Sequence, residues 1–228
     1  MIRVAVVRFP GSNCDADTLR AVRQAGAEAY YVWHRDADLQ QADAVILPGG
    51  FAYGDYLRAG AIARFSPVMA AVQAHADSCG PVLGICNGFQ ILCEAGLLPG
   101  ALMRNARLSF VSRPVRVRVE TDDTPFTAAF EPGALFRVPV AHGEGRYVAA
   151  PDDVRALEGE GRVVLRYVDD NPNGAVNDIA GVTNVERNVV GMMPHPERAG
   201  DSLLGEAAGA KVFDSMVKRT RLPLGGTR

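Results

Sequence analysis

The sequence predicts an α/β fold in which a mostly parallel central sheet carries helices on both faces, with an additional β-rich portion. Short apolar runs alternate with helical patterns along the first half of the chain, and glycine or proline marks their short connections. This alternation is typical of a parallel sheet that is buried on both sides. No internal repeat or low-complexity linker divides the 228 residues, so we expect a single domain over residues 1–228.

The first elements form a βα unit. An apolar run at 2–7 predicts a strand, and the pattern from about Cys14 to Ala25 predicts a helix, with Asn13 as N-cap and Gly26 just past the end. Two further strands are expected at 29–33 and 44–47, and the second of them ends on a Pro-Gly-Gly turn.

A second helix and a strand-to-helix turn follow. Ser66 and Pro67 predict a helix start, with serine as N-cap and proline at the first helical position, and the helix should close before Gly80. The run at 82–85 then predicts a short strand, and 87–95 an amphipathic helix.

From Ala106 to Asp170 the pattern becomes richer in β structure. Valines alternate with arginines at 115–119, and the run RVVLRYV at 162–168 predicts another strand. An apolar strand is expected at 189–193 and a final helix at 203–219, with basic residues near its C-terminal end.

Composition excludes several classes of protein. The formal net charge of -2 gives no electrostatic reason to expect a nucleic-acid partner. The N-terminus shows no signal peptide and no apolar run approaches a membrane span of about 20 residues, so we expect a cytoplasmic protein without membrane contact. The four cysteines form no CxxC pair and match no common zinc spacing, which predicts reduced thiols and no metal site.

One cysteine stands in a pattern that predicts a nucleophile. Cys86 lies between Gly84 and Gly88, where a predicted strand meets a predicted helix. In such a nucleophile elbow the glycines remove side chains that would clash, and the helix N-terminus favours the thiolate. The simpler interpretation is a packed, small hydrophobic residue, which we prefer for the other three cysteines, Cys14, Cys79 and Cys93.

The best base for this thiol is His195, within Pro-His-Pro-Glu directly after a predicted strand. The flanking prolines favour extended backbone, so His195 and Glu197 can point to the same side. A histidine held by a carboxylate is the usual partner of a thiol nucleophile. A solvated ion pair in a turn is the alternative, and the elbow cysteine makes it the weaker one.

Two backbone N–H groups are candidates for an oxyanion hole. The turn at Gly49 and Gly50 follows a predicted strand and therefore opens at the same sheet edge as Cys86. We expect the N–H groups of Gly50 and Asn87 to face the developing oxyanion, although two glycines after a strand can equally form a bare turn.

The ordered motifs PGG, G-x-C-x-G-x-Q and H-P-E resemble those of the class I glutamine amidotransferases, whose domain is flavodoxin-like. The resemblance implies that Cys86 is the nucleophile, His195 the general base and acid, and Glu197 the group that orients it. It implies further that Gly50 and Asn87 form the oxyanion hole, and that Gly50 and Gln90 help to hold the glutamine substrate.

Longer blocks carry a narrower resemblance. The stretches VRFPGSNCDADT, LPGGFAYGDYLRAGAIARFSP, GICNGFQIL, PVAHGEGRY and GMMPHPER are spread over most of the chain. Together they resemble the glutaminase subunits of phosphoribosylformylglycinamidine synthases, which supply ammonia in purine biosynthesis. The resemblance implies that His142, Gly143 and Glu144 lie near the glutamine site. It also implies a large synthetase partner, and a small third subunit besides.

The same resemblance implies that ATP and Mg²⁺ bind to the synthetase partner and that this subunit itself has no cofactor. In agreement, the chain contains no G-x-x-x-x-G-K-[ST] phosphate loop. The aromatic residues Phe51, Tyr53 and Tyr56 either dock that partner or belong to the core, and the sequence does not separate the two alternatives.

Three other functions remain open from the sequence. The shared triad also fits a glutaminase that serves another acceptor, and the architecture fits a thiol hydrolase without a synthetase. A third alternative is a non-catalytic assembly module that retains the fold. Labelling of Cys86 by a glutamine-derived electrophile would exclude the last of these.

Overall fold

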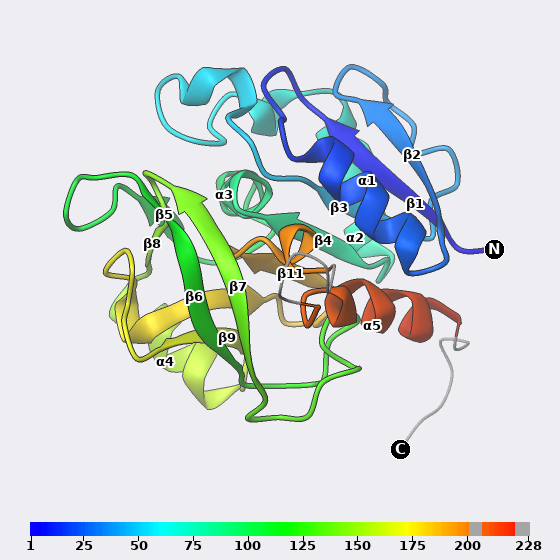
Figure 1. Cartoon of the computed structure of the whole chain (residues 1–228). Coiled ribbons are helices and arrows are strands. Elements are labelled where there is room, and N and C mark those ends of the chain that lie inside the picture. The colour runs from blue at the N-terminus through cyan, green and yellow to red at the C-terminus, as the bar shows by residue number, and fades with distance from the viewer. Residues whose placement is uncertain (201–206, 222–228) are drawn as a thin grey trace.

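The computed structural model describes residues 1–200 and 207–221, and nine of the strands in this part form one sheet (Figure 1). Five of the nine strands are β1 (Arg3–Arg8), β2 (Glu28–Trp33), β3 (Ala44–Leu47), β4 (Val82–Ile85) and β11 (Val189–Met192). They pair in parallel in the order β2-β1-β3-β4-β11, and we call them the parallel half.

The other four strands of the sheet are antiparallel. They are β6 (Val111–Val119), β7 (Leu135–His142), β9 (Val163–Val168) and β10 (Ile179–Thr183). They continue the sheet from β11 in the order β10-β9-β6-β7, and we call them the antiparallel half. The predicted β-rich portion is therefore an extension of the same sheet. A separate antiparallel pair joins β5 (Ala101–Met103) and β8 (Arg146–Val148).

Five α-helices accompany these strands in the described part of the chain. They are α1 (Asp15–Gln24), α2 (Val68–Asp77), α3 (Asn87–Glu94), α4 (Pro151–Gly159) and α5 (Ala210–Arg221). The chain runs from β1 through α1 to β2, which lies at one edge of the sheet. It runs from β3 through α2 to β4, in the opposite direction along the strand order. Right-handed crossovers therefore place α1 and α2 on opposite faces, and α5 packs beside α1 (Figure 1). The predicted α/β fold is confirmed.

The structure differs from the sequence-based prediction at the starts of the helices. Cys14, not Asn13, is the N-cap of α1, because the Cys14 N–H donates to the carbonyl of Gly49 and delays the helix. Pro67 rather than Ser66 is the N-cap of α2, since the Ser66 hydroxyl contacts Tyr53 Oη at 3.0 Å. The first residues of the predicted final helix, 203–206, lie outside the described residues. Residues 207–209 are not helical.

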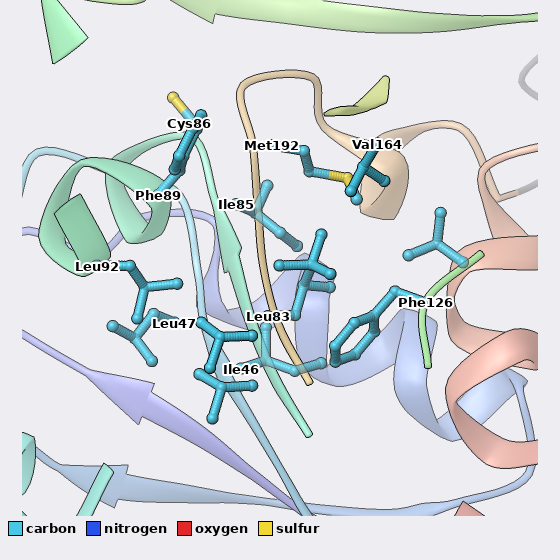
Figure 2. Close-up of a cluster of buried hydrophobic side chains, with 14 of the residues drawn as sticks. Ile46, Leu47, Leu83, Ile85, Cys86, Phe89, Leu92, Phe126, Val164 and Met192 are labelled. Atoms are coloured by element: carbon cyan, nitrogen blue, oxygen red, sulfur yellow. The ribbon is translucent and has the colours of Figure 1, made fainter. Parts of the chain in front are cut away.

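Burial in the core explains both the continuous apolar runs and the alternating pattern of the sequence. Every residue of β3, β4 and β11 is buried, as expected of strands covered on both faces. In β6 the alternating valines are buried and the arginines between them are exposed, which confirms the predicted alternation. Figure 2 shows Ile46, Leu83 and Ile85 packed beneath the strand-to-helix turn, with the sulfur of Cys86 at the edge of this cluster. No helix in the described ranges is long and apolar enough to cross a bilayer.

Candidate active site

Cys86 occupies a strained turn between β4 and α3. Its φ is +51° and its ψ is −104°, a backbone conformation that non-glycine residues rarely adopt. The turn is held because the Cys86 N–H donates to the carbonyl of Met192 at 2.7 Å. Backbone strain of this kind is typical of functional sites. The turn places the Cys86 thiol at the carboxyl end of β4.

The two flanking glycines allow α3 to lie against the sheet. A Cβ at Gly84 would come within 2.6 Å of Leu92 Cδ1, and a Cβ at Gly88 would overlap the carbonyl oxygen of Leu47. The spacing G-x-C-x-G therefore reflects two close contacts, one of them with the neighbouring strand β3.

Strand register brings the predicted residues to one edge. Gly84 of β4 pairs with Leu47 of β3 and with Gly191 of β11. Because these strands are parallel, the residues that follow them emerge side by side at their carboxyl ends. A cavity of about 160 Å³ results, here named the Cys86–His195 cavity. It is lined by Cys14, Gly50, Cys86, Phe110, His195 and Arg198, among others.

His195 and Glu197 form a buried pair. His195 Nδ1 lies 2.6 Å from Glu197 Oε1, and the two residues are 1% and 5% exposed. His195 Nε2 is buried and has no hydrogen-bond partner among the described residues. The carboxylate therefore fixes the Nδ1–H tautomer and leaves Nε2 for proton transfer.

The charge of this pair favours a protonated imidazole. Burial opposes the imidazolium, but the negative charges of Glu197 and Cys86 outweigh it and hold the pKa of His195 well above its ordinary value. An imidazolium beside a thiolate is the arrangement that activates a cysteine nucleophile and can protonate its leaving group.

The oxyanion candidates lie at the same place. Gly50 has a φ of +152°, and a Cβ there would lie 2.7 Å from the carbonyl oxygen of Gly11, so only glycine fits. Asn87 is the first residue of α3, where a backbone N–H has no acceptor within the helix. Its side chain accepts from the Ala52 N–H at 3.0 Å and donates to Gln90 Oε1 at 2.9 Å.

A second cavity, of about 190 Å³, adjoins the first and shares Gly50 and Cys86 with it. We call it the Cys86–Glu144 cavity. It is lined by Gly50, Cys86, Gln90, His142, Gly143 and Glu144, together with Asp55, Phe51, Phe110 and Ala141. The structure thus brings every predicted site residue to these two cavities or directly beside them. Gln90 Nε2 donates to the carbonyl of Glu144 at 2.6 Å and so joins α3 to the loop after β7.

His142 contributes to the second cavity without offering its ring nitrogens. Nδ1 lies 3.2 Å from Asn105 Oδ1, and Nε2 lies 3.5 Å from Asn173 Nδ2. Burial and the charge of His195 lower the pKa of His142 to about 4, so its ring is neutral near pH 7. Asn105 also accepts from the Gly145 N–H, so this network fixes the loop that carries Gly143 and Glu144.

Several residues of the site were not assigned a role from the sequence, among them Cys14 and Asp55. Cys14 is buried as expected, but its sulfur accepts a hydrogen bond from Arg198 at 2.8 Å and lies close to His195 and Glu197. Asp55 lines the Cys86–Glu144 cavity. Both stand in the quoted blocks FPGSNCD and YGDYLR, which were the available signal. The expectation of a packed Cys79 is wrong, because that residue is exposed.

The donor atoms of Cys14, His195 and Glu197 lie within 4.8 Å of one another, close enough to hold a metal ion. The chemistry of the group favours hydrogen bonding instead. The Arg198 guanidinium already contacts the Cys14 sulfur, and His195 Nδ1 is already committed to the Glu197 carboxylate. These contacts therefore hold the His195 imidazole in place.

Comparison with known proteins agrees with this chemistry. The family of CobB/CobQ-like glutamine amidotransferase domains matches residues 1–217. Phosphoribosylformylglycinamidine synthase subunit PurQ of Rubrobacter xylanophilus is 63% identical over 216 residues, or 95% of this chain and 98% of the relative. The subunit of the same name from Frankia casuarinae is 58% identical over 216 residues, or 94% and 93% of the two chains. A chain of the solved PurLQS structure from Thermotoga maritima matches with a TM-score of 0.89 and 47% identity, covering 96% of this chain and 99% of its own.

Proposed function

The chain belongs to the CobB/CobQ-like glutamine amidotransferase family and is a glutaminase subunit of phosphoribosylformylglycinamidine synthase, and we propose that Cys86, His195 and Glu197 carry its chemistry. It hydrolyses glutamine to glutamate and ammonia. The observation that carries the proposed residue roles is the shared cavity, in which the strained Cys86 turn meets the buried His195–Glu197 pair.

The first half-reaction forms a thioester. The thiolate of Cys86 attacks the carboxamide carbon of glutamine, and the N–H groups of Gly50 and Asn87 stabilise the oxyanion that forms. As the carbon–nitrogen bond breaks, His195 Nε2 gives its proton to the departing nitrogen, which leaves as ammonia. The products of this step are a glutamyl thioester and a neutral imidazole.

The second half-reaction restores the enzyme. The neutral His195 removes a proton from water, and the resulting hydroxide attacks the thioester carbonyl. The carbon–sulfur bond then breaks, which releases glutamate and regenerates the thiolate–imidazolium pair. Glu197 holds the ring in the orientation that both proton transfers need.

The ammonia is consumed by a partner. The proposed complex contains a large synthetase subunit and a small third subunit, in line with the PurLQS structure that the chain resembles. ATP and Mg²⁺ are assigned to the synthetase subunit, which converts formylglycinamide ribonucleotide to formylglycinamidine ribonucleotide. We place the complex in the cytoplasm, where purine biosynthesis takes place.

The loop after β3 is a candidate contact for that partner. Phe51, which lines both cavities, is 44% exposed, and Tyr56 is 75% exposed. Tyr53 instead packs inward and lies 2.7 Å from His34 Nδ1. Of the three aromatic residues that the sequence left undecided, two are therefore available for docking and one supports the loop.

Replacement of the nucleophile tests this function. In the assembled complex, Cys86→Ala should abolish synthesis with glutamine and leave synthesis with added ammonia at the wild-type rate, because ammonia bypasses the thiol. The measurement is product formation with each nitrogen source. Cys79→Ala is the matched control, since that exposed cysteine lies outside both cavities and should change neither rate.

Two results would contradict the proposal. Retained glutamine-dependent synthesis in Cys86→Ala would show that another residue is the nucleophile. Loss of synthesis with both nitrogen sources, in a complex that still assembles, would show that this chain is needed for more than ammonia release.

A further inference from the structure

The Cys86–Glu144 cavity contains two carboxylates that the glutaminase mechanism does not use. Asp55 and Glu144 both line it, together with Cys86. They belong to different parts of the molecule, because Asp55 follows β3 in the parallel half and Glu144 follows β7 in the antiparallel half. Side chains from the two halves therefore line the same cavity.

Asp55 is held in place by a strained loop. Tyr53 and Asp55 have φ values of +55° and +54°, and Gly54 between them has +68°. Left-handed backbone costs a non-glycine residue about 1–2 kcal/mol. The turn nonetheless places Asp55 Oδ1 3.3 Å from the Asn87 side-chain nitrogen, beside the nucleophile turn. Such strain is typical of positions that a functional site requires.

The charges of the pair are poorly compensated. Burial and the charge of Glu144 raise the pKa of Asp55 to about 6. Among the described residues, no basic side chain forms an ion pair with Asp55. In the same part of the chain, Glu144 forms an ion pair with Arg104 alone, with the two charged groups 3.7 Å apart and the arginine side chain 77% exposed. Two half-buried carboxylates that repel each other fit a small cation between them.

The adjoining Cys86–His195 cavity, which shares Gly50 and Cys86 with this one, contains an independent sign of a ligand. His195 Nε2 is fully buried there and has no hydrogen-bond partner among the described residues. A glutamine whose carboxamide lies between Cys86 and this nitrogen extends its other end into the Cys86–Glu144 cavity. That end carries an α-ammonium group, the one positive charge of the substrate.

We propose that Asp55 and Glu144 bind the α-ammonium group of glutamine and thereby select the free amino acid over amides that lack this charge. The inference rests on the proposed function and adds to it a specificity site. Asp55 is the stronger partner, because Glu144 is shared with Arg104 and with the Ala59 N–H.

The test compares glutamine with glutaramic acid, which has the same carboxamide and carboxylate but no amino group. In the assembled complex, Asp55→Asn should lower kcat/KM for glutamine on the order of 10- to 100-fold, the effect of losing one charge-assisted hydrogen bond. The inhibition constant of glutaramic acid against glutamine should change by less than about 3-fold. Glu144→Gln should show the same selectivity with a smaller loss.

Two controls accompany this comparison. Asp122→Asn removes the same charge from an exposed residue outside both cavities and should alter neither constant. Thermal unfolding checks the fold: because the folded protein raises the pKa of Asp55, its ionised form opposes folding above about pH 4–6, and the asparagine variant should be as stable as wild type or more so.

The outcomes separate clearly. A loss for glutamine alone supports the inference, whereas equal losses for glutamine and glutaramic acid, or no loss for either, would overturn it and leave the Cys86 mechanism intact. Failure of the wild-type complex to hydrolyse glutamine would overturn the proposed function itself, and this inference with it.

Discussion

The two halves of the sheet supply different things to one cavity. The parallel half contributes the groups to which we assign the chemistry, each shortly after a buried strand: the oxyanion candidate Gly50 after β3, Cys86 after β4 and His195 after β11. The antiparallel half contributes the opposite wall, where Gly143 and Glu144 follow β7. The proposed reacting groups are thus fixed by strand register, and Glu144 on the opposite wall is fixed by the side-chain hydrogen bonds of its loop. Asp55 is the exception, because it belongs to the parallel half and is proposed to recognise the substrate.

The halves are joined by few contacts at the site, and these set the relative position of wall and nucleophile. The His195 N–H donates to the carbonyl of Pro139 in β7, and Gln90 donates to the carbonyl of Glu144. Substitutions that displace Cys86 or His195 should therefore lower kcat, and substitutions that displace the wall formed by the antiparallel half should mainly raise KM for glutamine.

The largest effect is expected when the imidazole loses its carboxylate. Glu197→Gln should lower glutaminase activity roughly 10²- to 10⁴-fold, because the ring is no longer oriented or stabilised when charged. Glu197 raises the pKa of His195, so its removal lowers that pKa. The alkaline limb of the kcat/KM profile should move to lower pH. An unshifted limb would show that Glu197 does not act through the ring.

A smaller effect is expected from closing the gap beneath the nucleophile. A Cβ in Gly88→Ala would overlap the Leu47 carbonyl and push α3 away from β3, moving the thiol. Displacement of about 1 Å costs on the order of 10²-fold in rate, and we expect that loss in kcat. The matched control is Gly159→Ala in α4, where the added methyl meets nothing within 4 Å and should stabilise the fold by about 0.5–1 kcal/mol. An unchanged kcat in Gly88→Ala would refute the proposed packing.

The antiparallel half is probed by Asn105→Ala. Asn105 is fully buried and bonds both the Gly145 N–H and the carbonyl of His142, which would lose their partner. Stability should fall by about 1–3 kcal/mol, and KM for glutamine should rise about 5- to 10-fold with little change in kcat. Equal changes in both constants would indicate that the two halves are not separable in this way.

The smallest effect is expected from the second buried thiol. Cys14→Ala removes a weak sulfur contact of His195 and Arg198, so kcat/KM should fall by no more than about 3-fold. The alkaline limb should shift in the same direction as in Glu197→Gln, and by less. Cys79→Ala provides the baseline, and a shift of equal size in both cysteine variants would rule out a role for Cys14.

Prediction from the sequence was most accurate where a short local pattern is enough to fix the position of a residue in the fold. Each strand of the parallel half is a continuous apolar run, and Cys86, His195 and Glu197 stand in short motifs at strand ends, so register alone brings them together. The helix starts at Cys14 and Pro67 departed from expectation because distant residues, Gly49 and Tyr53, compete for the capping groups. Asp55 was missed because its position depends on a left-handed loop that no periodicity reveals.

The common register of β3, β4 and β11 also determines where the chain tolerates added residues. One residue inserted into any of these strands would rotate the side chains that follow to the opposite face and remove a reacting group from the cavity. The hairpin between β10 and β11 turns at the opposite edge of the sheet, and its Val185 is 66% exposed. A peptide tag placed between Val185 and Glu186 would therefore lie far from the glutamine site, which makes this hairpin the natural attachment point for immobilising the enzyme.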